Sequence, residues 1–179
     1  VKTAGDLEVI QTEGFDALRV NHPVMEWKTK EKKKVYVQIG WDGRVAPNEL
    51  VQTFYLAQQK DQVTQLSRDV DTAVSELTQL VEGLSEVDKT DLTEILNDKQ
   101  DAFKKTELNK AIKDLPKLAK GETWPEDSTE AAMLSAKALI AQRDKLKKNL
   151  KAAQEQLEKD TYATIEALTE AQVDEVLTA

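Results

Sequence analysis

The 179-residue chain contains no cysteine and only one histidine. Without cysteine there is no disulfide framework, no thiolate metal ligand and no thiolate nucleophile, and a structural zinc site has too few ligands. Aromatic residues make up only 5% of the chain, which argues against a large β-sandwich or barrel. No apolar run approaches the ~20 residues of a membrane span, and the first residues lack the apolar stretch of a signal peptide. We therefore expect a soluble, cytoplasmic protein.

Acidic residues outnumber basic ones, and 33 aspartates and glutamates against 25 lysines and arginines give a net charge of -8. A chain with this balance is not a polybasic nucleic-acid binder as a whole, although a local basic patch is compatible with it. Leucine, alanine, glutamine, glutamate and lysine are abundant, and all of them are good helix formers. The composition therefore favours a mainly α-helical fold.

The strongest pattern begins after Pro47, where we expect a first helical arm over residues 48–84. Asn48 is a suitable N-cap, and neither proline nor glycine follows until Gly83. From Val63 onward, spacings of three and four residues alternate between apolar positions, which is the repeat of a coiled coil. The seam residues of this arm are Leu56, Val63, Leu66, Val70, Leu77 and Leu80.

A second helical arm of similar length is expected over residues 128–159. Asp127 and Glu130 have the spacing of a capping box at its start. The first arm is mainly acidic over 61–82 and the second mainly basic over 143–151, so opposite charges favour their pairing. We therefore predict a long antiparallel two-helix coiled-coil hairpin. The seam residues of the second arm are Leu139, Leu146, Leu150 and Leu157.

Two segments adjoin the predicted arms. Residues 85–127 are expected to form a helical cap, with short helices and a loop that holds Trp124. Residues 160–179 are expected to end in a short helix, because Thr169-Glu170-Ala171-Gln172 has the spacing of a capping box.

Residues 1–47 differ from the rest and are expected to be a small β and irregular segment, the edge of a truncated domain. The best strand is 35–39, with 8–10 and 18–20 as partner strands, and 41–44 contains a turn signal. The predicted fold class is thus mainly α: the hairpin, its short helical cap and this small N-terminal segment.

No group of residues has the spacing of a catalytic, cofactor or metal site. His22 precedes Pro23 in an irregular stretch and is interpreted as a surface or packing residue. A run of lysines is interpreted as a solvated strand flank or loop, with phosphate contact as the alternative; it comprises Lys28, Lys30, Lys32, Lys33 and Lys34. The tryptophans Trp27, Trp41 and Trp124 are interpreted as packing residues rather than as a platform for nucleic-acid bases.

The stretch from Arg44 to Ala57 resembles a pattern in the methyltransferase (M) subunit of type I restriction-modification systems. In that family, a strand and a turn lead to a Pro-x-x-Leu helix start, an aromatic pair and a long acidic coiled-coil helix; the matching residues here run from Pro47 to Gln59. The resemblance resumes at 146–157 and continues through Tyr162 and 168–177, where the family has a second helix that leads to a short Leu-Thr-Glu helix. It covers roughly residues 40–179.

The catalytic motifs of that family are not in this sequence. There is no Asn-Pro-Pro-aromatic motif, which holds the target adenine, and no glycine-rich loop for S-adenosylmethionine. The resemblance therefore implies a region distal to the methyltransferase fold, with no catalytic, cofactor-binding or metal-binding residue of its own. The parent subunit would be an S-adenosylmethionine-dependent adenine-N6 DNA methyltransferase.

The resemblance also implies a partner, the specificity subunit, with which the C-terminal helices of the M subunit associate. The chain would then contact DNA only as part of the complex, and no membrane partner is expected. On this interpretation the seam leucines hold the hairpin together, while Phe103 and Trp124 in the cap offer a partner surface. The alternatives are an unrelated coiled-coil adaptor or chaperone-like arm, and a helical arm that clasps nucleic acid.

Overall fold

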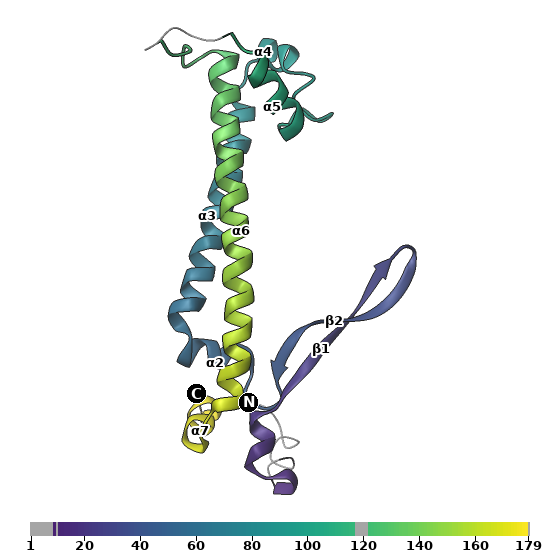
Figure 1. Ribbon diagram of the computed structural model, residues 1–179, viewed down its shortest axis with the longest axis vertical. Coiled ribbons are helices and arrows are strands. Elements are labelled where there is room, and N and C mark those ends of the chain that lie inside the picture. The colour runs from purple at the N-terminus through teal and green to yellow at the C-terminus, as the bar shows by residue number, and fades with distance from the viewer. Residues whose placement is uncertain (1–8, 10, 117–121, 179) are drawn as a thin grey trace. The chain divides into compact units, whose positions relative to one another are not determined.

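The computed structural model describes residues 9, 11–116 and 122–178 (Figure 1). These residues are mainly helical and contain one two-stranded antiparallel sheet. In the part of the chain that is described, no helix combines the length and the apolar character that a membrane crossing requires. The chain divides into two compact units: unit 1 comprises Val1–Thr64 and Lys151–Ala179, and unit 2 comprises Gln65–Leu150.

The sheet of unit 1 is a hairpin of β1 (Asn21–Lys30) and β2 (Lys33–Gly43), joined by a two-residue turn (Figure 1). The turn residues Glu31 and Lys32 both have positive φ, 49° and 66°, as the twist of a tight hairpin requires. The sequence carries no glycine or asparagine there, so the usual signal for such a turn is missing. The predicted strand at 35–39 is confirmed as part of β2.

The predicted partner strands are wrong. Leu18 and Arg19 lie in the 3-10 helix η1 (Phe15–Arg19) and Val9 is helical, while Glu8 and Ile10 lie outside the described residues. The true partner is β1, which contains Pro23. Proline is compatible with it because each strand of a two-stranded sheet has an unpaired edge.

The end of β2 is tied to helix α2 (Asn48–Tyr55) by side chains. The carboxylate of Asp42 accepts a hydrogen bond from the Asn48 N–H at 3.0 Å, and the Asn48 side chain accepts one from the Gly43 N–H at 3.2 Å. Asn48 was predicted as the N-cap; instead it is the first helical residue, and Asp42 satisfies its backbone N–H. Residues 41–43, where a turn was predicted, are the last of β2, and the chain bends at 44–46.

The core of unit 1 joins α2 to the end of α6 (Thr129–Ala167) and to α7 (Glu170–Thr178). Its fully buried side chains are Val45, Ala46, Val51, Ile165, Leu168, Val173 and Val176. The capping box predicted before the last helix is confirmed, because the Thr169 N–H donates to Gln172 Oε1 at 2.9 Å and the Gln172 N–H donates to Thr169 Oγ1 at 3.4 Å.

Two long helices, α3 (Ala57–Glu82) and α6, have parts in both units. The single helical arm predicted over 48–84 is divided into two helices: α3 is separated from α2 at Leu56, whose φ of -126° and ψ of 27° are not helical. Helix α3 ends at Glu82, directly before Gly83. Helix α6 is capped by the Ser128 hydroxyl, which accepts from the Ala131 N–H at 3.2 Å, one residue later than the predicted Asp127. It continues beyond residue 159 to Ala167, since no proline or glycine interrupts it.

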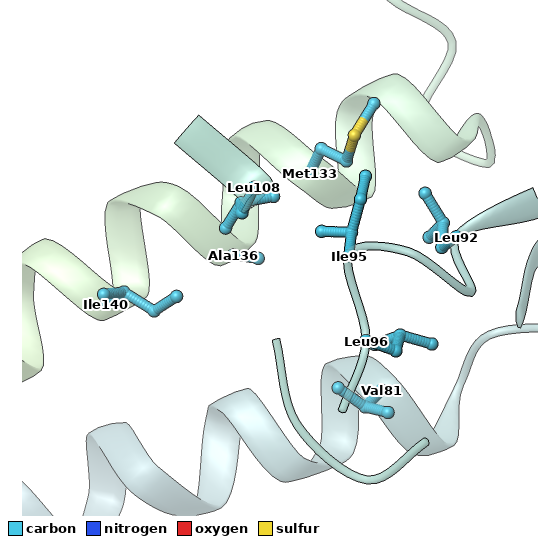
Figure 2. Packing of buried hydrophobic residues seen from close by; sticks show 8 residues of the cluster. All are labelled: Val81, Leu92, Ile95, Leu96, Leu108, Met133, Ala136 and Ile140. Carbon is cyan, nitrogen blue, oxygen red and sulfur yellow. The ribbon is translucent and has the colours of Figure 1, made fainter. Parts of the chain in front are cut away.

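The cap of unit 2 contains α4 (Glu86–Asp91), which opens with a capping box between Ser85 and Asp88, and α5 (Lys105–Asp114). The chain between these helices returns on itself in a single bridge between Leu96 and Phe103. Figure 2 shows how side chains from the cap, from the end of α3 and from the start of α6 converge in one core. Its buried residues are Val81, Leu92, Ile95, Leu96, Leu108, Met133, Ala136 and Ile140.

Candidate functional site

The predicted seam residues lie on α3 and α6, with Leu56 at the junction before α3, and most of them keep part of their surface in solvent. Val70 and Leu157 are buried. The other eight are half-buried: Leu56, Val63, Leu66, Leu77, Leu80, Leu139, Leu146 and Leu150. Apolar side chains that keep part of their surface accessible can contribute to a surface on which another helix packs.

In unit 2 the face that packs against the cap is wider than the predicted seam, because the seam residues Leu77 and Leu80 pack against its core together with neighbouring residues. Val81 and Ile140 are buried at 3% and 5% exposure, while their seam neighbours Leu80 and Leu139 are half-buried. Val81, Ile140 and Met133 are buried core residues that were not predicted from the sequence. The signal was present, because an apolar residue beside a seam position widens the stripe beyond the narrow seam of a simple coiled coil.

In unit 1 polar side chains join α6 to α2 and α3. Gln52 donates to the buried hydroxyl of Thr161, and Gln59 donates to the carboxylate of Asp160, both at 3.1 Å. Gln59 was noted in the sequence as the polar residue at the start of the seam. The contact with Asp160 explains why a polar residue is tolerated at this position.

The two residues predicted as a partner surface have different surroundings in unit 2. Phe103 is half-buried, packs against the core of the cap and lines a hollow of about 120 Å³ with Val81 and Arg143. Trp124 is half-buried in the loop before α6 and is not among the described residues of that core. The structure therefore gives Phe103 a structural contact, whereas the indole of Trp124 keeps accessible surface outside the core.

Charges in unit 2 link the cap to α6 rather than α3 to α6. Asp144 accepts hydrogen bonds from Lys105 of α5 and from the neighbouring Arg143, and these bonds, first that of Lys105, lower the pKa of the Asp144 carboxyl. Among the described residues of unit 2, no salt bridge joins an acid of α3 to a base of α6. The lysines Lys145, Lys147 and Lys148 are exposed. Within the described part of unit 2, the predicted charge pairing of the two arms is therefore not made by direct salt bridges.

A tyrosine fixes α2 to α7 in unit 1. The Tyr55 hydroxyl donates to Glu175 Oε2 at 2.8 Å. Burial, and then this hydrogen bond to an anionic carboxylate, raise the pKa of Tyr55. The hydroxyl thus stays protonated and remains a donor at neutral pH.

Within the described residues, no group of three or more histidine, aspartate or glutamate side chains has the geometry to hold a metal ion. His22 is exposed in β1. Three features keep apolar or aromatic surface accessible and are candidate binding surfaces: the half-buried leucines of α3 and α6, Trp124, and the exposed hairpin of β1 and β2.

Comparison of the chain with protein-family models, with curated proteins and with solved structures finds no match. The comparisons therefore leave the family of the chain open.

Proposed function

We propose that this chain is the non-catalytic helical region of the methyltransferase subunit of a type I restriction-modification system, and that it docks on the specificity subunit in the cytoplasm. The parent subunit would carry S-adenosylmethionine and methylate adenine elsewhere in its sequence. The role of this region is then assembly: it holds the methyltransferase on the subunit that recognises DNA.

The observation that carries this proposal is the core of unit 1. The two stretches that resemble the family lie far apart in the sequence, yet side chains of the first share one buried core with side chains from the region of the second. Val45 and Val51 come from the first stretch, and Ile165 and Val173 come from the region of the second. Sequence patterns that are matched separately but fold into one core are more informative than coiled-coil repeats alone.

We further propose that α3 and α6 pair as an antiparallel coiled-coil hairpin. Two contacts support this pairing, one within each unit. In unit 1 Gln59 bonds to Asp160, and in unit 2 Val81 shares a core with Ala136. Gln59 precedes Val81 along α3, whereas Asp160 follows Ala136 along α6, and this opposite order is that of an antiparallel pair. Half-buried leucines between these contacts would supply the seam and leave a strip for helices of the specificity subunit.

The hairpin predicts that the double variant Leu66→Ala and Leu77→Ala loses about 2–3 kcal/mol of unfolding free energy, because two half-buried leucines are removed. Chemical denaturation followed by circular dichroism measures this loss. Val74→Ala, on the same helix at 42% exposure, is the matched control and should change stability by less than ~0.5 kcal/mol. Equal effects of the double variant and the control would contradict the seam.

Docking is tested by mixing the purified chain with a cognate specificity subunit in the absence of DNA, followed by co-purification and titration. We expect a stoichiometric complex. Trp124→Ala should weaken it about tenfold, because partly exposed tryptophans are frequent anchors of interfaces. Trp41→Ala removes the same side chain from β2 and should leave the affinity unchanged.

The outcomes test the docking function and the assignment of Trp124 as a contact residue separately. If no complex forms, the docking function is wrong and the chain is a coiled-coil adaptor arm of another kind. If the complex forms but Trp124→Ala and Trp41→Ala bind equally well, the docking function stands and the assignment of Trp124 is wrong.

A further inference from the structure

The hairpin of β1 and β2 combines exposed aromatic rings with a strongly basic tip. Trp27 is 65% exposed and Tyr36 is 54% exposed. They are directly paired across the two strands, with ring centroids 4.9 Å apart and the ring planes inclined by 37°. The interpretation of Trp27 as a packing residue holds only for its contact with Tyr36, because most of the Trp27 side chain is exposed to solvent.

The pairing register places further side chains on the same face. Thr29 pairs with Lys34 next to the two rings on the side of the tip, and Met25 pairs with Gln38 on the other side. Side chains of alternate residues point to the same face of a strand, so the two rings form a continuous surface with these neighbours. All four neighbours are exposed.

The tip carries a concentrated positive charge. Residues 28–34 contain five lysines and one glutamate, in a chain whose net charge is -8. Lys28 forms an ion pair with Glu26 at 3.6 Å. Among the described residues, no salt bridge involves the other four lysines, Lys30, Lys32, Lys33 and Lys34. Like charges so close together repel each other, and a polyanion relieves this repulsion.

We propose that this hairpin binds single-stranded DNA, with bases stacked on Trp27 and Tyr36 and phosphates held by the lysines of the tip. Exposed rings beside a basic strip are the means by which proteins hold single strands without reading their sequence. In a duplex the faces of the bases are covered by stacking, so the rings would have no partner there. The choice of DNA over RNA rests on the proposed function, whereas the choice of a single strand rests on the hairpin itself.

Two other occupants fit the hairpin less well. A membrane-binding hairpin needs apolar side chains at its tip, but every residue from Lys30 to Lys34 is charged. An acidic protein segment would satisfy the lysines and leave the faces of both rings without a planar partner. Both occupants are separate outcomes of the test below.

The test is a fluorescence-anisotropy titration of the full chain with a labelled oligodeoxythymidylate of about 20 nucleotides, longer than the site of a typical single-strand-binding fold. Titrations between about 50 and 200 mM salt give the dependence of affinity on salt. We expect binding of the single strand that weakens as salt rises. The corresponding duplex, an oligouridylate, polyglutamate and vesicles of anionic lipid are the comparison ligands.

Two sets of variants separate the rings from the charges. The triple variant Lys32→Ala, Lys33→Ala and Lys34→Ala should weaken binding at least tenfold and lower the salt slope by about 2, because three phosphate contacts are lost. Its matched control removes the same charge from α6 by Lys145→Ala, Lys147→Ala and Lys148→Ala, and should bind as the unchanged chain does.

Trp27→Ala should weaken binding about tenfold through the loss of stacking, with little change in the salt slope. Tyr36→Phe keeps a ring and should retain affinity, which separates stacking from any effect of the hydroxyl. Circular dichroism and melting of each variant verify that the protein is folded. If Trp27→Ala loosens the hairpin, the lysine triple variant, which leaves both rings in place, decides the test.

The proposal is overturned if the unchanged chain does not bind the single strand, or if the α6 control loses affinity while the tip variant keeps it. If the duplex binds more tightly than the single strand, the stacking of bases on the two rings is wrong. If the oligouridylate binds more tightly than the oligodeoxythymidylate, the choice of DNA is wrong. Preference for polyglutamate or for vesicles assigns the hairpin to a protein or a membrane. No specificity subunit is present, so failure here leaves the docking function untouched.

Discussion

Gly43→Ala is expected to destabilise unit 1 by at least ~2 kcal/mol, because the position leaves no room for a side chain. A Cβ at Gly43 would lie 2.0 Å from the carbonyl oxygen of Ala46 and 3.1 Å from Cδ1 of Ile165. The first neighbour is backbone and cannot rotate away, so the bend between β2 and α2 would have to open. Urea denaturation followed by tryptophan fluorescence measures the loss, since Trp41 lies two residues away.

Gly40→Ala is the matched control in the same strand. A Cβ there would meet only Glu158 Oε1, at 3.2 Å, which is the end of an exposed side chain and can move. We expect a change of less than ~0.5 kcal/mol for this variant. Similar stability of both variants would contradict the close approach of β2 to the bend at 44–46 and, with it, the core that supports the proposed function.

Leu96→Ala is expected to cost ~2–5 kcal/mol of unfolding free energy, because its side chain is completely buried in the cap core of unit 2 (Figure 2). Leu96 also forms the bridge to Phe103, so a cavity there removes support from the chain between α4 and α5. Chemical denaturation followed by circular dichroism measures the loss of unfolding free energy.

Leu134→Ala removes the same atoms from α6 at a position that is 40% exposed. This control should remain within ~0.5 kcal/mol of the unchanged chain. If the two leucine variants are equally stable, residues 92–108 do not pack on α3 and α6 as described. Because the same cap carries Trp124, the docking test would then have to be made on a different surface.

The position of Asp42 illustrates why single-residue predictions failed where the elements around them were correct. The sequence alone favours Asn48 as an N-cap, since asparagine before an apolar run is a common helix start. The chain instead turns so that the Asp42 carboxylate reaches the Asn48 N–H, which frees the Asn48 side chain to donate to the carbonyl of Trp41 at 2.6 Å. A contact across a bend leaves no periodic pattern in a sequence.

The amphipathic helices were predictable for a different reason. Side chains three and four positions apart are neighbours on a helix. The apolar stripe, the cap and the end of a helix can therefore be predicted from residues that are close together in the sequence. The confirmed capping box at Thr169 and Gln172 and the end of α3 before Gly83 are examples. In contrast, Val81 and Ile140 become core residues only because the cap folds onto one side of their helices.

The hairpin of β1 and β2 was predictable only in part. Alternation of apolar residues identified β2, but Pro23 and the glycine-free turn at Glu31 and Lys32 concealed its partner. The cluster of lysines at the tip can also be identified from the sequence alone. Whether rings stand beside them depends on the register that pairs Trp27 with Tyr36, and register is a property of two strands together.

By itself the sequence determined that this chain is mainly helical and that α3 ends before Gly83, because both depend on nearby residues or on composition. Only the tertiary structure decided which apolar residues are buried and which remain exposed. It brought Val45 and Val51 together with Ile165 and Val173, and it left Trp27 in solvent. The physical reason is that burial is fixed by segments distant in the chain, which compete for the same apolar surface.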